Sequence, residues 1–120
     1  DMMCHSALVV PHLLTEPGKP LSSVKPVRIT EHIASLKWSR PAYAKKLQKS
    51  YGRSIDYSKR PSEDYASILI EFKTADGHKV IGEASTSWSF VGAGLRLSAE
   101  LLGPEYSMKW NSLDSGLNLF

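Results

Sequence analysis

The chain begins with a carboxylate and an imidazole four residues apart, Asp1 and His5, in the mostly apolar segment DMMCHSALVVPHLL. On a helix, residues i and i+4 lie on one face with Cβ atoms about 5–6 Å apart. The carboxylate could then hold the imidazole in one tautomer, and the imidazole could exchange a proton with a substrate. Alternatively, Asp1 only stabilises the helix N-terminus through its N–H groups and dipole, with His5 as an amphipathic neighbour. Spacing alone leaves both interpretations open.

A metal site and a thiol nucleophile are not expected. His5 and His12 share a helix face but lie about 10 Å apart along the axis, too far for one ion. Cys4 points about 100° away from His5 on a helix, and His32 and His78 lack the spacing of metal ligands. Cys4 is the only cysteine, which excludes an internal disulfide and fits a reducing compartment such as the cytoplasm. Its aliphatic neighbours indicate a packing role.

Three side chains are candidates for substrate binding. Trp38 and Arg40 lie in WSRPAY, where a predicted strand leads into a helix, and aromatic and arginine side chains on such loops often bind ligands. The alternative is an edge aromatic that covers the core. Trp88 lies among hydroxyls in EASTSWSF, which could bind a polyhydroxylated ligand or form the solvated side of a sheet.

No residue is expected to bind a cofactor. The segment GAGL at 92–95 lacks the third glycine and the following helix of a dinucleotide fingerprint, so its glycines indicate a bulge or a turn.

The first half of the chain predicts two helices around one strand. Apolar residues at helical spacing predict a helix over 1–14, which Pro11 would kink or end early. Residues 15–23 (TEPGKPLSS) are a loop, and alternation predicts a long strand over 24–38. A helix over 39–52 has a serine to cap it, a proline in its first turn and a glycine to stop it.

The second half predicts antiparallel strands. An Asp76-Gly77 turn joins a strand over 65–73 to a return strand over 78–90. Further alternating runs lie at 95–101, 106–111 and 117–120. This order predicts an α+β fold, a mostly antiparallel open sheet with helices on one face.

Composition agrees with one globular domain over 1–120, because 42% of the residues are apolar and 22% are charged. The net charge of +3 and the basic run from Lys37 to Arg60 fit a solvated face better than a nucleic-acid interface. Nucleic-acid binding therefore ranks last among the functions considered. No apolar run approaches the roughly 20 residues of a membrane span. The helix at residue 1 and the uncovered edge strand at 117–120 suggest a piece of a longer protein, truncated at both ends.

Several segments together resemble the C-terminal half of the Gfo/Idh/MocA oxidoreductases. They are Asp1-x-x-x-His5 at the start of a helix, GEASTSWSF, and GLRLSAELLGPEYSMKW. The resemblance covers nearly the whole chain. It departs from the family pattern at Met3, where the family commonly has glycine, and no E-K-P segment is present to supply the family's lysine.

The resemblance implies a fold like the C-terminal domain of glyceraldehyde-3-phosphate dehydrogenase and hydride transfer between a sugar, polyol or related substrate and NAD or NADP. His5 would accept the substrate hydroxyl proton, and Asp1 would orient His5 or the substrate. The cofactor would be held mainly by an N-terminal Rossmann domain outside this chain, so the fragment alone is expected to be inactive. The resemblance further implies a homo-oligomer formed through the sheet. The alternative is a non-catalytic module for sheet-mediated oligomerisation or ligand binding.

Overall fold

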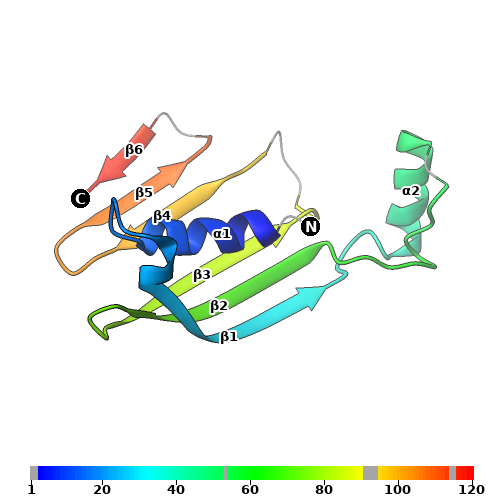
Figure 1. Ribbon diagram of the computed structural model, residues 1–120. Helices are drawn as coiled ribbons and strands as arrows, with labels where there is room; N and C mark the ends of the chain where they lie inside the picture. Colours follow the sequence, from blue (N-terminus) through cyan, green and yellow to red (C-terminus); the bar gives the residue numbers. More distant parts are fainter. Residues whose placement is uncertain (1–2, 53, 91–94, 114–115) are drawn as a thin grey trace. The chain divides into compact units, whose positions relative to one another are not determined.

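A computed structural model describes residues 3–52, 54–90, 95–113 and 116–120. These residues contain two α-helices, a short 3-10 helix and six strands with antiparallel pairing throughout, which confirms the α+β class (Figure 1). The strands form two three-stranded sheets, sheet A and sheet B, in two compact units of residues 1–90 and 91–120. In chain order the elements are α1 (Met3–Leu14), η1 (Leu21–Ser23), β1 (Val24–Ala34), α2 (Pro41–Tyr51), β2 (Tyr65–Thr74), β3 (Lys79–Ser87), β4 (Ser98–Leu102), β5 (Ser107–Asn111) and β6 (Gly116–Leu119).

Sheet A has the strand order β1-β2-β3. The predicted hairpin between β2 and β3 is confirmed, and Gly77 takes the left-handed conformation that its turn requires, with φ of 89°. The Gly77 N–H donates to the Thr74 carbonyl over 3.0 Å, and the Thr74 N–H donates to the His78 carbonyl over 3.0 Å. Strand β1 is an edge strand, which tolerates Pro26 without a backbone donor. Beside it, Val27 is the extra residue of a bulge.

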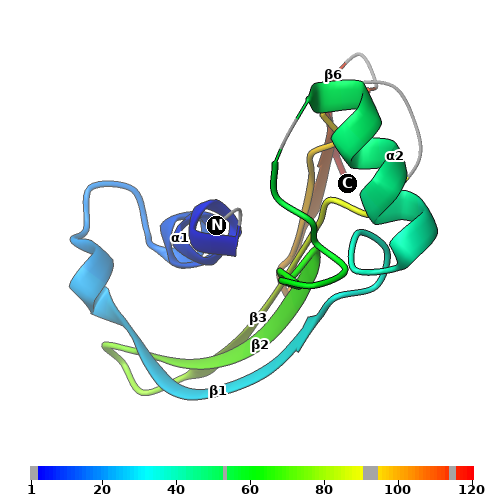
Figure 2. The same cartoon turned by 90° about the vertical axis from the view of Figure 1, so that its right-hand side faces the viewer.

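Helix α1 lies over one face of sheet A, mainly on β3 (Figure 2). It continues through Pro11 to Leu14, and the Thr15 hydroxyl donates to the Pro11 carbonyl over 2.7 Å at the last turn. Its half-buried positions recur every three to four residues, as one helix face requires. Val10 and Leu14 from this face pack on the core. That core consists of Val24, Ile70 and Phe72, with Ile68 and Val80 beside it.

Gly82 of β3 lets the helix approach the sheet closely. It is buried, and a Cβ atom placed there would overlap Val10 Cγ1 and come within 3.1 Å of Phe72 Cε2. A side chain at this position would therefore push α1 away from the core.

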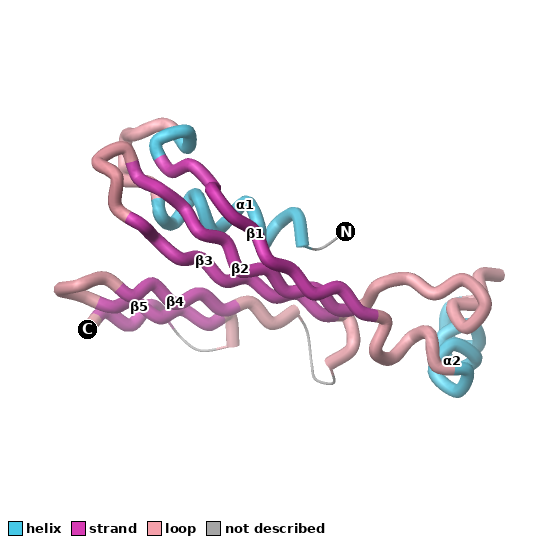
Figure 3. The backbone as a smooth tube through the Cα atoms, turned by 90° about the horizontal axis from the view of Figure 1, so that it is seen from below, coloured by secondary structure: helices cyan, strands magenta, loops and turns pink. Residues whose placement is uncertain are grey.

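Helix α2 lies beyond the ends of β1 and β2, not over the sheet (Figures 1 and 3). Its predicted bounds are confirmed to within two residues, and Gly52 ends it with φ of 59°. Among the described residues, neither helix has the length and apolar character needed to cross a membrane.

Sheet B is an antiparallel meander with the order β4-β5-β6. Strand β4 begins at Ser98, later than the expected Leu95, because the residues before it bond to Ser112 instead. The Leu97 N–H donates to Ser112 Oγ over 3.0 Å, and the Ser112 N–H donates to the Leu97 carbonyl over 2.8 Å. Cross-strand pairing gathers apolar residues on one face of sheet B. They are Ala99, Leu101, Met108, Trp110, Leu117 and Leu119.

The close approach at Gly82 can be tested with Gly82→Ala. We expect a loss of about 1–3 kcal/mol in unfolding free energy, because Val10 and α1 must shift. Chemical denaturation measures it. The neighbouring exposed Glu83→Ala variant is the control and should change stability by less than about 0.5 kcal/mol. Equal effects of the two substitutions would contradict this packing.

Candidate functional site

The carboxylate of Asp64 organises the end of sheet A where β1 stops. Asp64 is 3% exposed. Its Oδ1 accepts the Leu36 N–H over 2.7 Å, and its Oδ2 accepts the N–H groups of Lys37 and Trp38, each over 2.8 Å. These bonds turn the chain out of β1 after Ala34, which is why the strand is shorter than the sequence pattern predicts.

The main chain of Asp64 ties the same loop to β1 and β3. Its N–H donates to the Ala34 carbonyl over 3.1 Å, and its carbonyl accepts the Trp88 N–H over 2.8 Å. The Ser87 hydroxyl donates to the same carbonyl over 3.2 Å. Asp64, directly before β2, thus links the segment that follows β1 to the segment that follows β3.

Hydrogen bonding keeps Asp64 ionised despite its burial. Burial by itself raises the pKa of this carboxyl. The N–H donors of Leu36, Trp38 and Lys37 favour the charged form, and together they lower the pKa by more than burial raises it. The net effect is a pKa below the usual 3.8.

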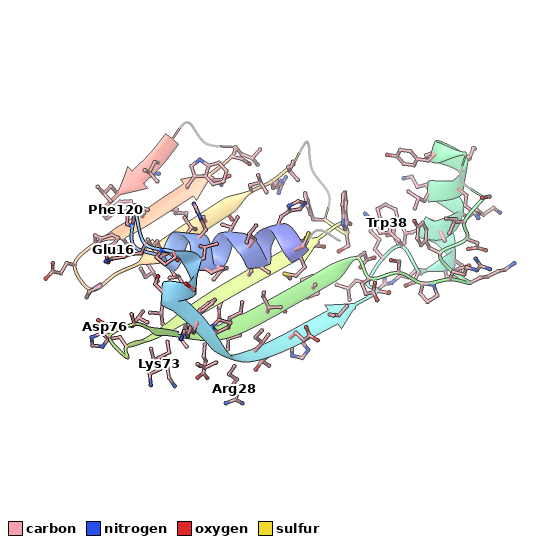
Figure 4. The ribbon with its side chains drawn as sticks, viewed as in Figure 1. Glu16, Arg28, Trp38, Lys73, Asp76 and Phe120 are labelled. Carbon is pink, nitrogen blue, oxygen red and sulfur yellow. The ribbon has the colours of Figure 1, made fainter. Side chains whose placement is uncertain are left out.

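An aromatic corner lies beside this carboxylate and contains Lys37, Trp38, Tyr43 and Trp88. The Trp38 indole N–H donates to the Trp88 carbonyl over 2.9 Å. The Trp38 and Tyr43 rings meet edge to face with centroids 6.4 Å apart. The Lys37 ammonium lies 4.5 Å from the Trp38 ring centroid and 5.5 Å from that of Tyr43, distances typical of cation–π contacts. Figure 4 shows Trp38 between the end of the sheet and α2.

Two of the three predicted substrate-binding residues, Trp38 and Trp88, lie together, whereas Arg40 does not join them. Trp38 and Trp88 share the aromatic corner, and the Trp88 side chain is 57% exposed. Arg40 precedes α2, and its carbonyl accepts the N–H groups of Tyr43 and Ala44, each over 3.0 Å. Its side chain is exposed and makes no hydrogen bond or ion pair within the described residues, so its clearest role is to start α2.

Three of the four hydroxyl side chains around Trp88, those of Thr86, Ser87 and Ser89, bond within the protein. Ser87 Oγ and Ser89 Oγ lie 2.6 Å apart, and the Thr86 hydroxyl bonds to that of Ser6 in α1 over 2.9 Å. These groups stabilise the corner and the helix contact. For them the structural interpretation is the better one, and the neighbouring Trp88 remains exposed.

His5 lies on the outer face of α1, away from sheet A. This face is exposed and carries Cys4, His5, Leu8, Val9, His12 and Leu13. The expectation that Cys4 has a packing role is therefore wrong, since it is exposed. Asp1 lies outside the described residues, so the pairing of Asp1 with His5 stays a prediction.

The N-terminal turn of α1 lies at the same end of sheet A as Trp88. The bond between Ser6 and Thr86 fixes it there, and a pocket of about 40 Å³ has Met3, Thr86 and Trp88 among its lining residues. His5, two residues after Met3, is exposed to solvent. Within the described ranges, no group of three or more metal-ligand side chains is close enough to hold an ion.

Comparison with known proteins gives no match: no protein-family model, no curated protein and no solved structure is similar to this chain. The resemblance to the Gfo/Idh/MocA oxidoreductases stays a prediction from sequence.

Substituting Asp64 tests the role of its carboxylate. We expect Asp64→Asn to lower the unfolding free energy by about 2–4 kcal/mol, because the amide cannot replace a charged acceptor of three N–H groups. Denaturant titration near pH 7 measures this loss. The adjacent exposed Glu63→Gln variant is the control, and a comparable loss in it would argue against a special role for Asp64.

The lowered pKa of Asp64 predicts that its contribution to stability depends on pH, which the Asp64→Asn variant can test. A carboxyl whose pKa is lowered on folding stabilises the protein above its unfolded pKa, and this stabilisation is lost as the pH falls through the folded value. The stability difference between the natural chain and Asp64→Asn should therefore shrink as the pH drops below about 3.8. Thermal unfolding at a series of pH values measures it, and a constant difference would contradict the assignment.

Proposed function

We propose that this chain is the substrate-binding part of a cytoplasmic NAD(P)-dependent oxidoreductase that acts on a sugar, polyol or related hydroxylated compound. The observation that supports this most is the position of His5, exposed on a helix whose first turn lies at the same end of sheet A as an exposed tryptophan. An imidazole serves for proton transfer from a hydroxyl, and an indole ring offers an apolar face to a sugar ring.

Each residue has a distinct role in this proposal. His5 accepts the proton of the substrate hydroxyl, and Asp1 orients His5 or the substrate. Trp88 contacts the substrate, while Trp38 positions Trp88 through the bond from its indole N–H to the Trp88 carbonyl. Asp64 positions both tryptophans indirectly, because it accepts hydrogen bonds from their backbone N–H groups.

A Rossmann dinucleotide site has a glycine-rich turn from a strand into a helix. The connection from β1 to α2, residues 35–40, is SLKWSR and does not have this pattern. The proposal therefore assigns the cofactor to a Rossmann domain outside these residues.

A His5→Gln variant of the full-length protein tests the proton-transfer role. We expect turnover to fall by about 10²- to 10⁴-fold, the usual contribution of a general base, with unchanged affinity for NAD(P). Steady-state kinetics and calorimetry measure the two quantities. His12→Gln is a matched control, because His12 is exposed on the same face of α1 about 10 Å away. Full activity of His5→Gln, or equal losses in both variants, would refute the role.

A second candidate, self-association through a sheet, is favoured by the apolar face of sheet B. On this face Leu117 and Leu119 are 60% and 68% exposed, and adjacent exposed apolar residues in a sheet favour association. This function is compatible with the first and could also exist alone.

Leu117→Glu tests the association. We expect it to shift the protein from oligomer to monomer in sedimentation velocity, because a charge would be buried in the interface. Asn118→Glu places the same charge on the other face of β6 and should leave the oligomer intact. If the natural chain is a monomer, or if both variants dissociate equally, sheet B is not the interface.

A further inference from the structure

A row of three lysines crosses the three strands of sheet A on the face opposite α1. Lys25 of β1 pairs with Lys73 of β2, and Lys73 pairs with Lys79 of β3. Their neighbours Val24 and Phe72 belong to the core under α1, so alternation along the strands directs the lysines to the other face. With neighbouring strands about 4.8 Å apart, the row spans about 10 Å.

Next to this row on the same face lie Arg28 of β1 and its pairing partner Glu71 of β2, which add one cation and one carboxylate. Glu71 bonds to Lys79 over 3.2 Å and lies 4.0 Å from Arg28. Arg28 and Lys79 keep side-chain exposures of 73% and 68%. The nearby Asp76 is engaged by His78 and by the Thr74 hydroxyl. Figure 4 shows Lys73 near the turn that carries Asp76, and Arg28 projecting from β1.

This basic row, defined as Lys25, Arg28, Lys73 and Lys79, is not balanced by its own carboxylate. Four cations against Glu71 leave three positive charges, as many as the net charge of +3 of the entire chain. Lys25 and Lys73 are exposed and have no ion-pair partner in the described part of the chain. Like charges directly opposite each other on neighbouring strands destabilise a sheet, so the arrangement costs stability unless an anion neutralises it.

We propose that the basic row binds a free small molecule that carries two or more phosphate groups. Lysine ammonium groups bind phosphate as point charges, and three of them in line suit a ligand with several phosphates along about 10 Å. A single-stranded nucleic acid is a poorer fit, because these two rows of sheet A contain no aromatic side chain on which bases could stack.

Calorimetric titration with tripolyphosphate tests the proposal. The chain should bind it saturably, and Lys25→Gln/Lys73→Gln should weaken binding at least tenfold. The matched control is Lys45→Gln/Lys49→Gln, which removes two exposed charges from α2 and should change affinity less than twofold. Glu71→Gln should bind more tightly than the natural chain, since it removes the competing carboxylate. In the absence of ligand, Lys73→Gln should raise the denaturation midpoint.

Three outcomes would overturn the proposal. The first is the absence of saturable binding by the natural chain. The second is an equal loss of affinity in the two double variants, which would show a general charge effect. The third is tighter binding, through the same lysines, of a single-stranded oligonucleotide or of vesicles that contain a phosphoinositide.

Discussion

A buried carboxylate directly before β2 determines how one end of sheet A is built. Asp64 takes three backbone N–H groups from the chain after β1 and accepts the Trp88 N–H at its own carbonyl. A buried charge is tolerated only when it is fully hydrogen-bonded. The residues from Leu36 to Trp38 therefore have one low-energy arrangement, and that arrangement brings the Trp38 indole to the carbonyl of Trp88.

The resulting site combines fixed backbone with exposed side chains. The corner is held by hydrogen bonds and cation–π contacts within the protein, whereas the Trp88 ring and the His5 imidazole remain open to solvent. The bond between Ser6 and Thr86 joins these two parts, because it anchors the first turn of α1 to the end of β3. A rigid support for a few exposed groups is what substrate positioning requires.

Local patterns were sufficient to predict the α+β class, the Asp76-Gly77 hairpin and the bounds of α2. Each depends on residues close together in the sequence. Asp64 could not be found in this way, since its partners lie 26 to 28 residues away. Nor could the orientation of α1, because apolar residues occupy both of its faces and only contact with Gly82 and the core decides which one is buried.

In the function proposed above, a hydroxylated substrate binds where the first turn of α1 lies beside Trp88. The most direct measurement is a titration with a polyol, followed by NMR of the imidazole signals and of the three tryptophan indole N–H signals. Binding at this place should shift the His5 and Trp88 signals saturably and leave the Trp110 signal unaffected. Saturable shifts confined to Trp110, or none at His5 and Trp88 up to the solubility limit of the polyol, would contradict it.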